Sequence, residues 1–131
     1  MLRGILGVIA GLVAGALATG GGEGLGHFLY PLPAGVDVYD PKVQTTLMNI
    51  VPMEAKLAVV LAWAFGVFVG CIVAIFVAQR QSWPAWVVAV LLFVFALWTM
   101  TIIPHPDWML WAATAGTLVS AVAAAYIFAR R

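Results

Sequence analysis

Charged side chains are scarce in this sequence. Only 8% of its 131 residues are Asp, Glu, Lys or Arg, whereas 65% are hydrophobic and the mean hydropathy is +1.10. Soluble domains carry about 25% charged residues, so this composition excludes an ordinary soluble domain and indicates a membrane protein. The formal net charge is only +1, which leaves no basic surface for a nucleic acid. We therefore expect no nucleic-acid partner.

Cysteine is nearly absent, and the common catalytic motifs are absent altogether. Cys71 is the only cysteine, which excludes an intramolecular disulfide and a cluster of thiolate metal ligands. Because it lies in a long apolar run, we expect a buried, unreactive thiol. The sequence has no nucleophile–base motif, no phosphate-binding glycine loop and no HExxH pattern. We therefore predict no enzymatic activity, no catalytic residue and no cofactor apart from the metal considered below.

The sequence is rich instead in apolar segments of membrane-spanning length. A helix needs about 20 mostly apolar residues to cross the hydrocarbon core, and its backbone amides must be paired within the helix. The chain therefore predicts an all-α, polytopic bundle of four transmembrane helices that forms a single domain, residues 1–131. The predicted helices are residues 4–30, 53–78, 83–103 and 107–129.

The first segment has an alternative interpretation as a signal peptide. Arg3 would be its basic start, and Ala16-Leu17-Ala18 has the spacing of a cleavage site. The apolar stretch continues to Tyr30, however, and we therefore favour an uncleaved span.

The basic residues predict the orientation in the membrane. An N-terminus inside the cell puts all the arginines on the cytoplasmic side and only the lysines outside, as the positive-inside rule requires. We predict a multi-pass protein of the bacterial inner membrane, surrounded by lipid, with both termini in the cytoplasm. The arginines are Arg3, Arg80, Arg130 and Arg131, and the lysines are Lys42 and Lys56.

One connection is long, and it lies on the predicted outer side at about residues 31–52. Asp40 followed by Pro41 is typical of a helix start, with the acid as N-cap and proline at the first helical position. Val43, Leu47 and Ile50 would then share one face. This pattern predicts a short helix lying on the membrane surface, and a solvated loop is the alternative.

Small residues recur at every fourth position in the first, second and fourth segments. Such rows let helix backbones approach closely in lipid, so we expect these three helices to pack tightly and the third to face lipid more. Small-xxx-small rows also suit a homo-oligomer or a place in a larger membrane complex. The predicted packing positions are Gly7, Gly11, Gly15, Gly22, Gly26, Ala62, Gly66, Gly70 and Gly116.

Two further features lie inside the spans. The run Gly20-Gly21-Gly22 predicts a close approach of another backbone, with a kink as the alternative. Trp63 and Trp98 lie away from the aromatic belts at the membrane interfaces. We expect both rings to serve packing, and lining of a pocket is the alternative.

Polar side chains gather near the predicted outer face. Glu23 lies about 12 Å from the outer end of its helix, at ~1.5 Å per residue, and His27 is one turn above it on the same face. His105 lies in the turn before the fourth helix. We expect Asp107 to be the N-cap of that helix and Glu54 to lie in the first turn of the second, where the helix dipole favours negative charge.

This polar cluster has three interpretations. An ionised carboxylate inside a bilayer costs several kcal/mol, so Glu23 should face the bundle interior and either bind a partner or stay protonated. In the structural interpretation, which we favour, Glu23 and His27 bond to each other and to backbone or His105, in a small accessory or partner-binding membrane protein. In the metal interpretation, these three side chains bind a divalent ion together with Asp107 or Glu54. In the transport interpretation, Glu23 exchanges a proton for a substrate or ion.

Three blocks of the sequence carry a resemblance to a known family. They are EGLGHFLYPLPAG at residues 23–35, AWAFG at residues 62–66 and IPHPDW at residues 103–108. In this order they resemble a family of small four-helix bacterial inner-membrane proteins, and the resemblance covers nearly the whole chain. It implies a four-helix inner-membrane protein, and it carries no activity, cofactor or catalytic residue that can be transferred.

A looser likeness is to the small multidrug-resistance transporters. These have four short helices, carry an embedded glutamate in the first helix and work as dimers, and Glu23 looks like that glutamate. The chain departs from this family in its off-centre glutamate, its long first outer loop and its greater length. The likeness implies the transport interpretation by analogy only.

Overall fold

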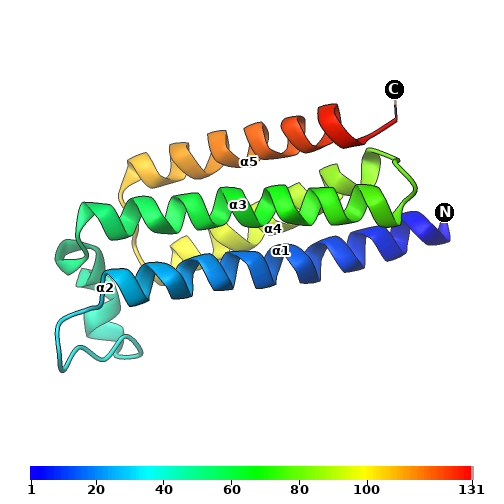
Figure 1. Ribbon diagram of the computed structural model, residues 1–131. Coiled ribbons are helices and arrows are strands. Elements are labelled where there is room, and N and C mark those ends of the chain that lie inside the picture. Colours follow the sequence, from blue (N-terminus) through cyan, green and yellow to red (C-terminus); the bar gives the residue numbers. More distant parts are fainter. Residues whose placement is uncertain (131) are drawn as a thin grey trace.

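The computed structural model describes residues 1–130, and these residues form an all-helical bundle without strands, as predicted. Four helices are long and apolar enough to cross a membrane, which makes this a multi-pass membrane protein. A short fifth helix lies at one end of the bundle (Figure 1). The long helices are α1 (Leu2–Leu29), α3 (Met53–Val77), α4 (Trp83–Ile102) and α5 (Asp107–Phe128), and the short one is α2 (Pro41–Ile50).

The predicted helix boundaries are confirmed to within two residues at every end. Both ends of the described chain lie at one end of the bundle, which we call the terminal end, and α2 lies at the other, which we call the α2 end (Figure 1). Arg131, one of the arginines behind the predicted orientation, lies outside the described residues. The orientation itself stays a prediction.

The helix α3 occupies the centre of the bundle. It packs against α1 on one side and against α5 on the other, and α4 contacts all three of them (Figure 1). The expected tight group of the first, second and fourth spans is therefore two separate pairs, since α1 and α5 lie on different sides of α3. Within an apolar 18-residue stretch of each span, α4 has the smallest buried share, in line with the expected lipid-facing position.

Glycine explains how closely α1 and α3 approach. A Cβ atom built on Gly11 would lie 2.6 Å from the carbonyl oxygen of Gly70, and one built on Gly70 would lie 2.7 Å from that of Gly11. The two backbones are therefore in direct contact, as in other membrane helix pairs built on small residues. The other predicted packing positions of this interface lie along the same line. They are Gly7 beside Ala74, Gly15 beside Gly66, Gly22 beside Ala62, and Gly26 beside Ala58.

The packing of α5 on α3 uses a small residue and a hydroxyl group. Gly116 lies against Ala64, whose Cβ would be 3.2 Å from a Cβ built on the glycine. One turn further along α5, the hydroxyl of Ser120 donates a hydrogen bond of 2.9 Å to the carbonyl oxygen of Ala64. A carbonyl inside α3 thus receives a second donor from a neighbouring helix.

The terminal half of the bundle is filled by an apolar core. The thiol of Cys71 is fully buried there, as expected, and donates to the carbonyl oxygen of Ala85 at 3.3 Å. At the same end, the Arg80 guanidinium lies 4.1 Å from the centre of the Phe76 ring and donates to the carbonyl oxygen of Phe128 at 3.0 Å. The buried core residues of this half are Val67, Cys71, Ile75, Ala85, Ala89, Ala121 and Ala124.

The predicted short helix is present as α2, so the solvated-loop alternative is wrong. The Asp40 carboxylate caps it by accepting the backbone N–H of Lys42 at 2.9 Å, and Pro41 occupies the first turn. The packed face differs from the expected one, because Leu47 is buried whereas Ile50 is 45% exposed. The residues that face the bundle are Gln44, Leu47, Met48 and Val51, at the i, i+3, i+4, i+7 spacing of one helix face.

Candidate functional site

A cavity of about 480 Å³ lies at the α2 end of the bundle, and we call it the large cavity. The helix α2 and the loop before it cover this cavity, while α1, α3 and the residues that follow α4 form its walls. Its volume falls in the usual range of small-molecule sites, and its lining is mainly apolar and aromatic with a few polar groups. The polar side chains that line it include Glu23, His27, Gln44, Thr99 and His105.

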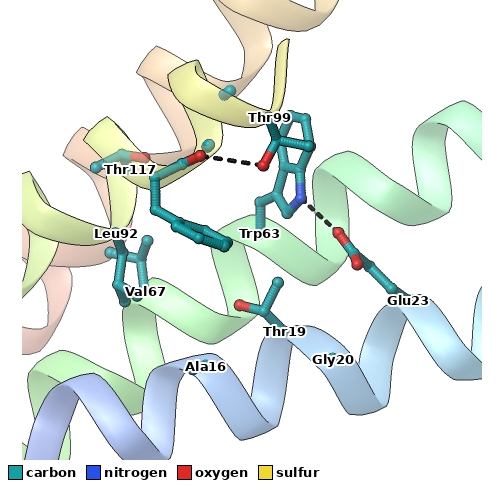
Figure 2. Close-up of a pocket in the computed structure, with 12 residues that line it drawn as sticks. Ala16, Thr19, Gly20, Glu23, Trp63, Val67, Leu92, Thr99 and Thr117 are labelled. Carbon is teal, nitrogen blue, oxygen red and sulfur yellow. Dashed lines mark hydrogen bonds between the residues drawn. The ribbon is translucent and has the colours of Figure 1, made fainter. Parts of the chain in front are cut away.

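A second cavity of about 200 Å³, the small cavity, lies deeper in the bundle between α1, α3, α4 and α5. It reaches Ala16 and Leu92, which lie near the middle of their helices. Figure 2 shows its lining, in which the side chains of Glu23 and Trp63 point toward each other. Glu23, Trp63 and Thr99 line both cavities, so the two cavities meet at these three side chains.

The Glu23 carboxylate is held by a single hydrogen bond. The indole Nε1 of Trp63 donates to its Oε1 atom at 2.6 Å (Figure 2), and Trp63 is only 8% exposed. A buried indole N–H needs an acceptor, and this carboxylate supplies it. Among residues 1–130 the other carboxylate oxygen has neither a hydrogen-bond donor nor a cationic partner, so it is available to a ligand.

The expected hydrogen bond between Glu23 and His27 is absent from the described residues. His27 follows one turn later on α1 and lines the large cavity, but its side chain is exposed. The physical reason is that Glu23 turns toward α3, where the buried indole of Trp63 provides a donor. The structure therefore brings His27 into the same cavity as Glu23 without pairing the two.

His105 reaches the site from the turn between α4 and α5. Its Nδ1 donates to the carbonyl oxygen of Ile103 at 2.5 Å, and the centre of its ring lies 5.7 Å from that of Trp63. Burial lowers the pKa of His105 from 6.5, and the bond to Ile103 and the charge of Glu23 only partly oppose this shift. The ring is therefore neutral at pH 7, and its Nε2 is a hydrogen-bond acceptor.

Asp107 and Glu54 lie outside the site. Both are exposed, and neither lines either cavity. The prediction that Asp107 caps α5 is wrong, because Pro106 holds the N-cap position with an extended backbone and α5 begins at Asp107 itself. Its carboxylate still lies in the first turn, where the helix dipole favours it.

The metal interpretation required three or more ligands close together. Within residues 1–130, no three His, Cys, Asp or Glu side chains lie close enough to hold a metal ion. Glu23, His27 and His105 therefore share a cavity without forming a coordination group.

Sequence reasoning named Trp63 but missed its role as the partner of Glu23. The available signal was chemical: an indole inside an apolar span needs an acceptor, and Glu23 is the one acidic residue placed deep in a span. Thr99 and the part played by α2 in covering the large cavity were missed as well. Trp98 is 58% exposed and lines neither cavity, in contrast to Trp63.

Comparison of the chain with protein-family models, with curated proteins and with solved structures gives no match.

Proposed function

We propose that this protein is a small proton-coupled membrane transporter in which Glu23 holds either a proton or a cationic substrate. One observation carries the proposal: the Glu23 carboxylate lines two adjoining cavities and has an oxygen that no described residue uses. A purely structural cluster would be closed and paired within itself. The accessory role predicted from the sequence has less support, because the Glu23–His27 bond on which it depended is absent among the described residues.

The polar atoms around the junction of the cavities favour a donor ligand. Glu23 offers a free carboxylate oxygen, and the neutral ring of His105 offers the lone pair of Nε2. The Thr99 hydroxyl donates a hydrogen bond of 3.1 Å to the carbonyl oxygen of Phe95 in its own helix (Figure 2). Toward a ligand, this hydroxyl can therefore act only as an acceptor. A ligand that fits three acceptors and apolar walls has N–H donors, a positive charge and an apolar body.

Proton exchange follows from the cost of leaving Glu23 charged and alone. A carboxylate without a counter-ion in a low-dielectric site is unfavourable, so either a cation or a proton must neutralise it. Departure of the substrate would therefore be coupled to protonation. The apolar core closes the terminal half of the bundle, and transport requires a second state in which that half opens.

The test uses n-butylammonium as the probe and the intact protein in phosphatidylcholine nanodiscs. We expect n-butylammonium to release protons from the wild-type protein and to shift the ¹⁵N-indole resonance of Trp63, which is assigned by its loss in Trp63→Phe. Glu23→Gln should do neither, although its amide oxygen still accepts the Trp63 bond and its melting temperature should stay close to wild type. If the wild type does not respond, or if Glu23→Gln responds equally, the transporter proposal fails.

A further inference from the structure

The helices α1 and α4 are in contact at Gly11 and Gly15 of α1. A Cβ atom built on Gly11 would lie 2.9 Å from Val88 of α4, and one built on Gly15 would lie 2.7 Å from Leu92. A Cβ atom built on Gly20, little more than one turn further along, would meet nothing within 4 Å. Five residues turn an α-helix by about 140°, so Gly20 lies on a different face of α1 from Gly15, and this face has open space beside it.

The small cavity lies beside this face of α1. Gly20 and Ala16 of α1 and Phe95 of α4 all line the cavity, and all three are also exposed on the surface of the bundle. The cavity wall between α1 and α4 is thus open at its side. Because this side belongs to two membrane-spanning helices, the opening faces the hydrocarbon of the bilayer and not the water at either end.

We propose that this side opening at Gly20 is a lateral portal, and that the substrate is a membrane-dissolved amine with a primary ammonium head and a single alkyl chain. The inference rests on the proposed function, since it assigns the head to Glu23. The head would use the free oxygen of Glu23, and the chain would lie in the small cavity and pass between α1 and α4 into the lipid.

The chemistry of the lining supports this occupant. The acceptors Glu23 and Thr99 lie at the inner limit of the large cavity, whereas the part of the small cavity next to the portal is formed by Ala16, Leu92 and Phe95. A single amine can therefore place its polar head against the acceptors and its apolar chain against the apolar residues. A chain that leaves through the portal also has no upper limit of length, in contrast to a chain in a closed pocket.

The experiment compares two neighbouring glycines. Gly20→Leu places a side chain in the portal, and Gly21→Leu is the matched control, because it also meets nothing within 4 Å but lines neither cavity. The affinities of n-butylammonium and n-dodecylammonium are measured in phosphatidylcholine nanodiscs from the indole resonance of Trp63. The readout is the ratio of the two affinities, so that partitioning of the longer amine into lipid is common to all variants.

We expect Gly20→Leu to lower the preference for n-dodecylammonium over n-butylammonium by about tenfold. This is the change expected when roughly two methylene groups of the longer amine are no longer buried in the cavity. Gly21→Leu should keep the wild-type ratio. An unchanged ratio in Gly20→Leu, with n-butylammonium binding that depends on Glu23, would overturn the portal and leave the proposed function standing. If neither amine binds to the wild type, both proposals fail.

Discussion

Trp63 donates its indole hydrogen to Glu23 at 2.6 Å, and this bond joins α3 to α1 where the two cavities meet. The bond fixes one carboxylate oxygen and leaves the other open. It also holds the indole next to the ring of His105, 5.7 Å away. Glu23 is therefore both a structural acceptor and the one acidic group in the cavities, and these two roles can be separated by substitution.

Replacing Trp63 tests the structural role. Trp63→Phe keeps an aromatic ring but removes the N–H, so the half-buried carboxylate loses its only donor among the described residues. We expect the free energy of unfolding to fall by about 1–3 kcal/mol, the usual cost of leaving such a group without its bond. Denaturant unfolding in detergent measures this change. Trp98→Phe is the control, because that ring is exposed and its indole makes no hydrogen bond to a described residue, and an equal loss in both variants would contradict the assignment.

The helices of this fold could be predicted because each signal is local. Four apolar runs are bounded by proline or polar turns, and the Asp40–Pro41 pair marks the start of α2. The row of glycines on α1 likewise pointed to the contact with α3. The four-residue spacing also included Gly22, which packs against Ala62. The close approach predicted for the run Gly20-Gly21-Gly22 holds at Gly22 alone, because Gly20 and Gly21 have open space beside them.

The candidate site was harder to predict because it depends on how separate helices align. Helical periodicity showed that Glu23 and His27 share a face, and both do line one cavity. It could not show which residue of another helix would lie opposite Glu23, and Trp63 lies 40 positions away. The cavities themselves depend on how the long helices pack around them and on the position of α2 over the bundle. Neither of these is a property of one segment.

The contact between α1 and α3 should tolerate no added methyl group at its centre. In Gly11→Ala the new Cβ would lie 2.6 Å from the Gly70 carbonyl oxygen and 2.9 Å from Ala74 and Val88, so the helices must move apart. We expect a loss of about 1–3 kcal/mol, typical of overpacking. Gly21→Ala is the control and should be neutral or stabilising by up to ~1 kcal/mol, since alanine is the better helix former. Denaturant unfolding compares the two, and a stable Gly11→Ala protein would argue against direct backbone contact.

The hydroxyl of Ser120 should contribute a small but measurable stabilisation between α5 and α3. Its bond to the Ala64 carbonyl oxygen joins two helices, and such bonds in membrane proteins average about 0.6 kcal/mol. We expect Ser120→Ala to lower the free energy of unfolding by about this amount. Thr114→Val removes a hydroxyl that bonds only to Leu110 within α5, so it should cost less. The reverse order would show that α5 does not depend on this bond.

Stability should depend on pH through His105. Its pKa in the folded protein is lowered from 6.5 by burial, so the unfolded chain binds more protons than the folded protein once the pH falls below about 6.5. Stability attributable to this group is therefore complete above pH 6.5, is lost as the pH falls toward the lowered folded pKa, and changes no further below it. His105→Asn keeps a donor for the Ile103 carbonyl oxygen but cannot titrate. On acidification from pH 8 to pH 5 in detergent, the melting temperature of the wild type should thus fall by more than that of His105→Asn. An equal fall in both proteins, or a larger fall in His105→Asn, would mean that His105 is not held neutral by its surroundings.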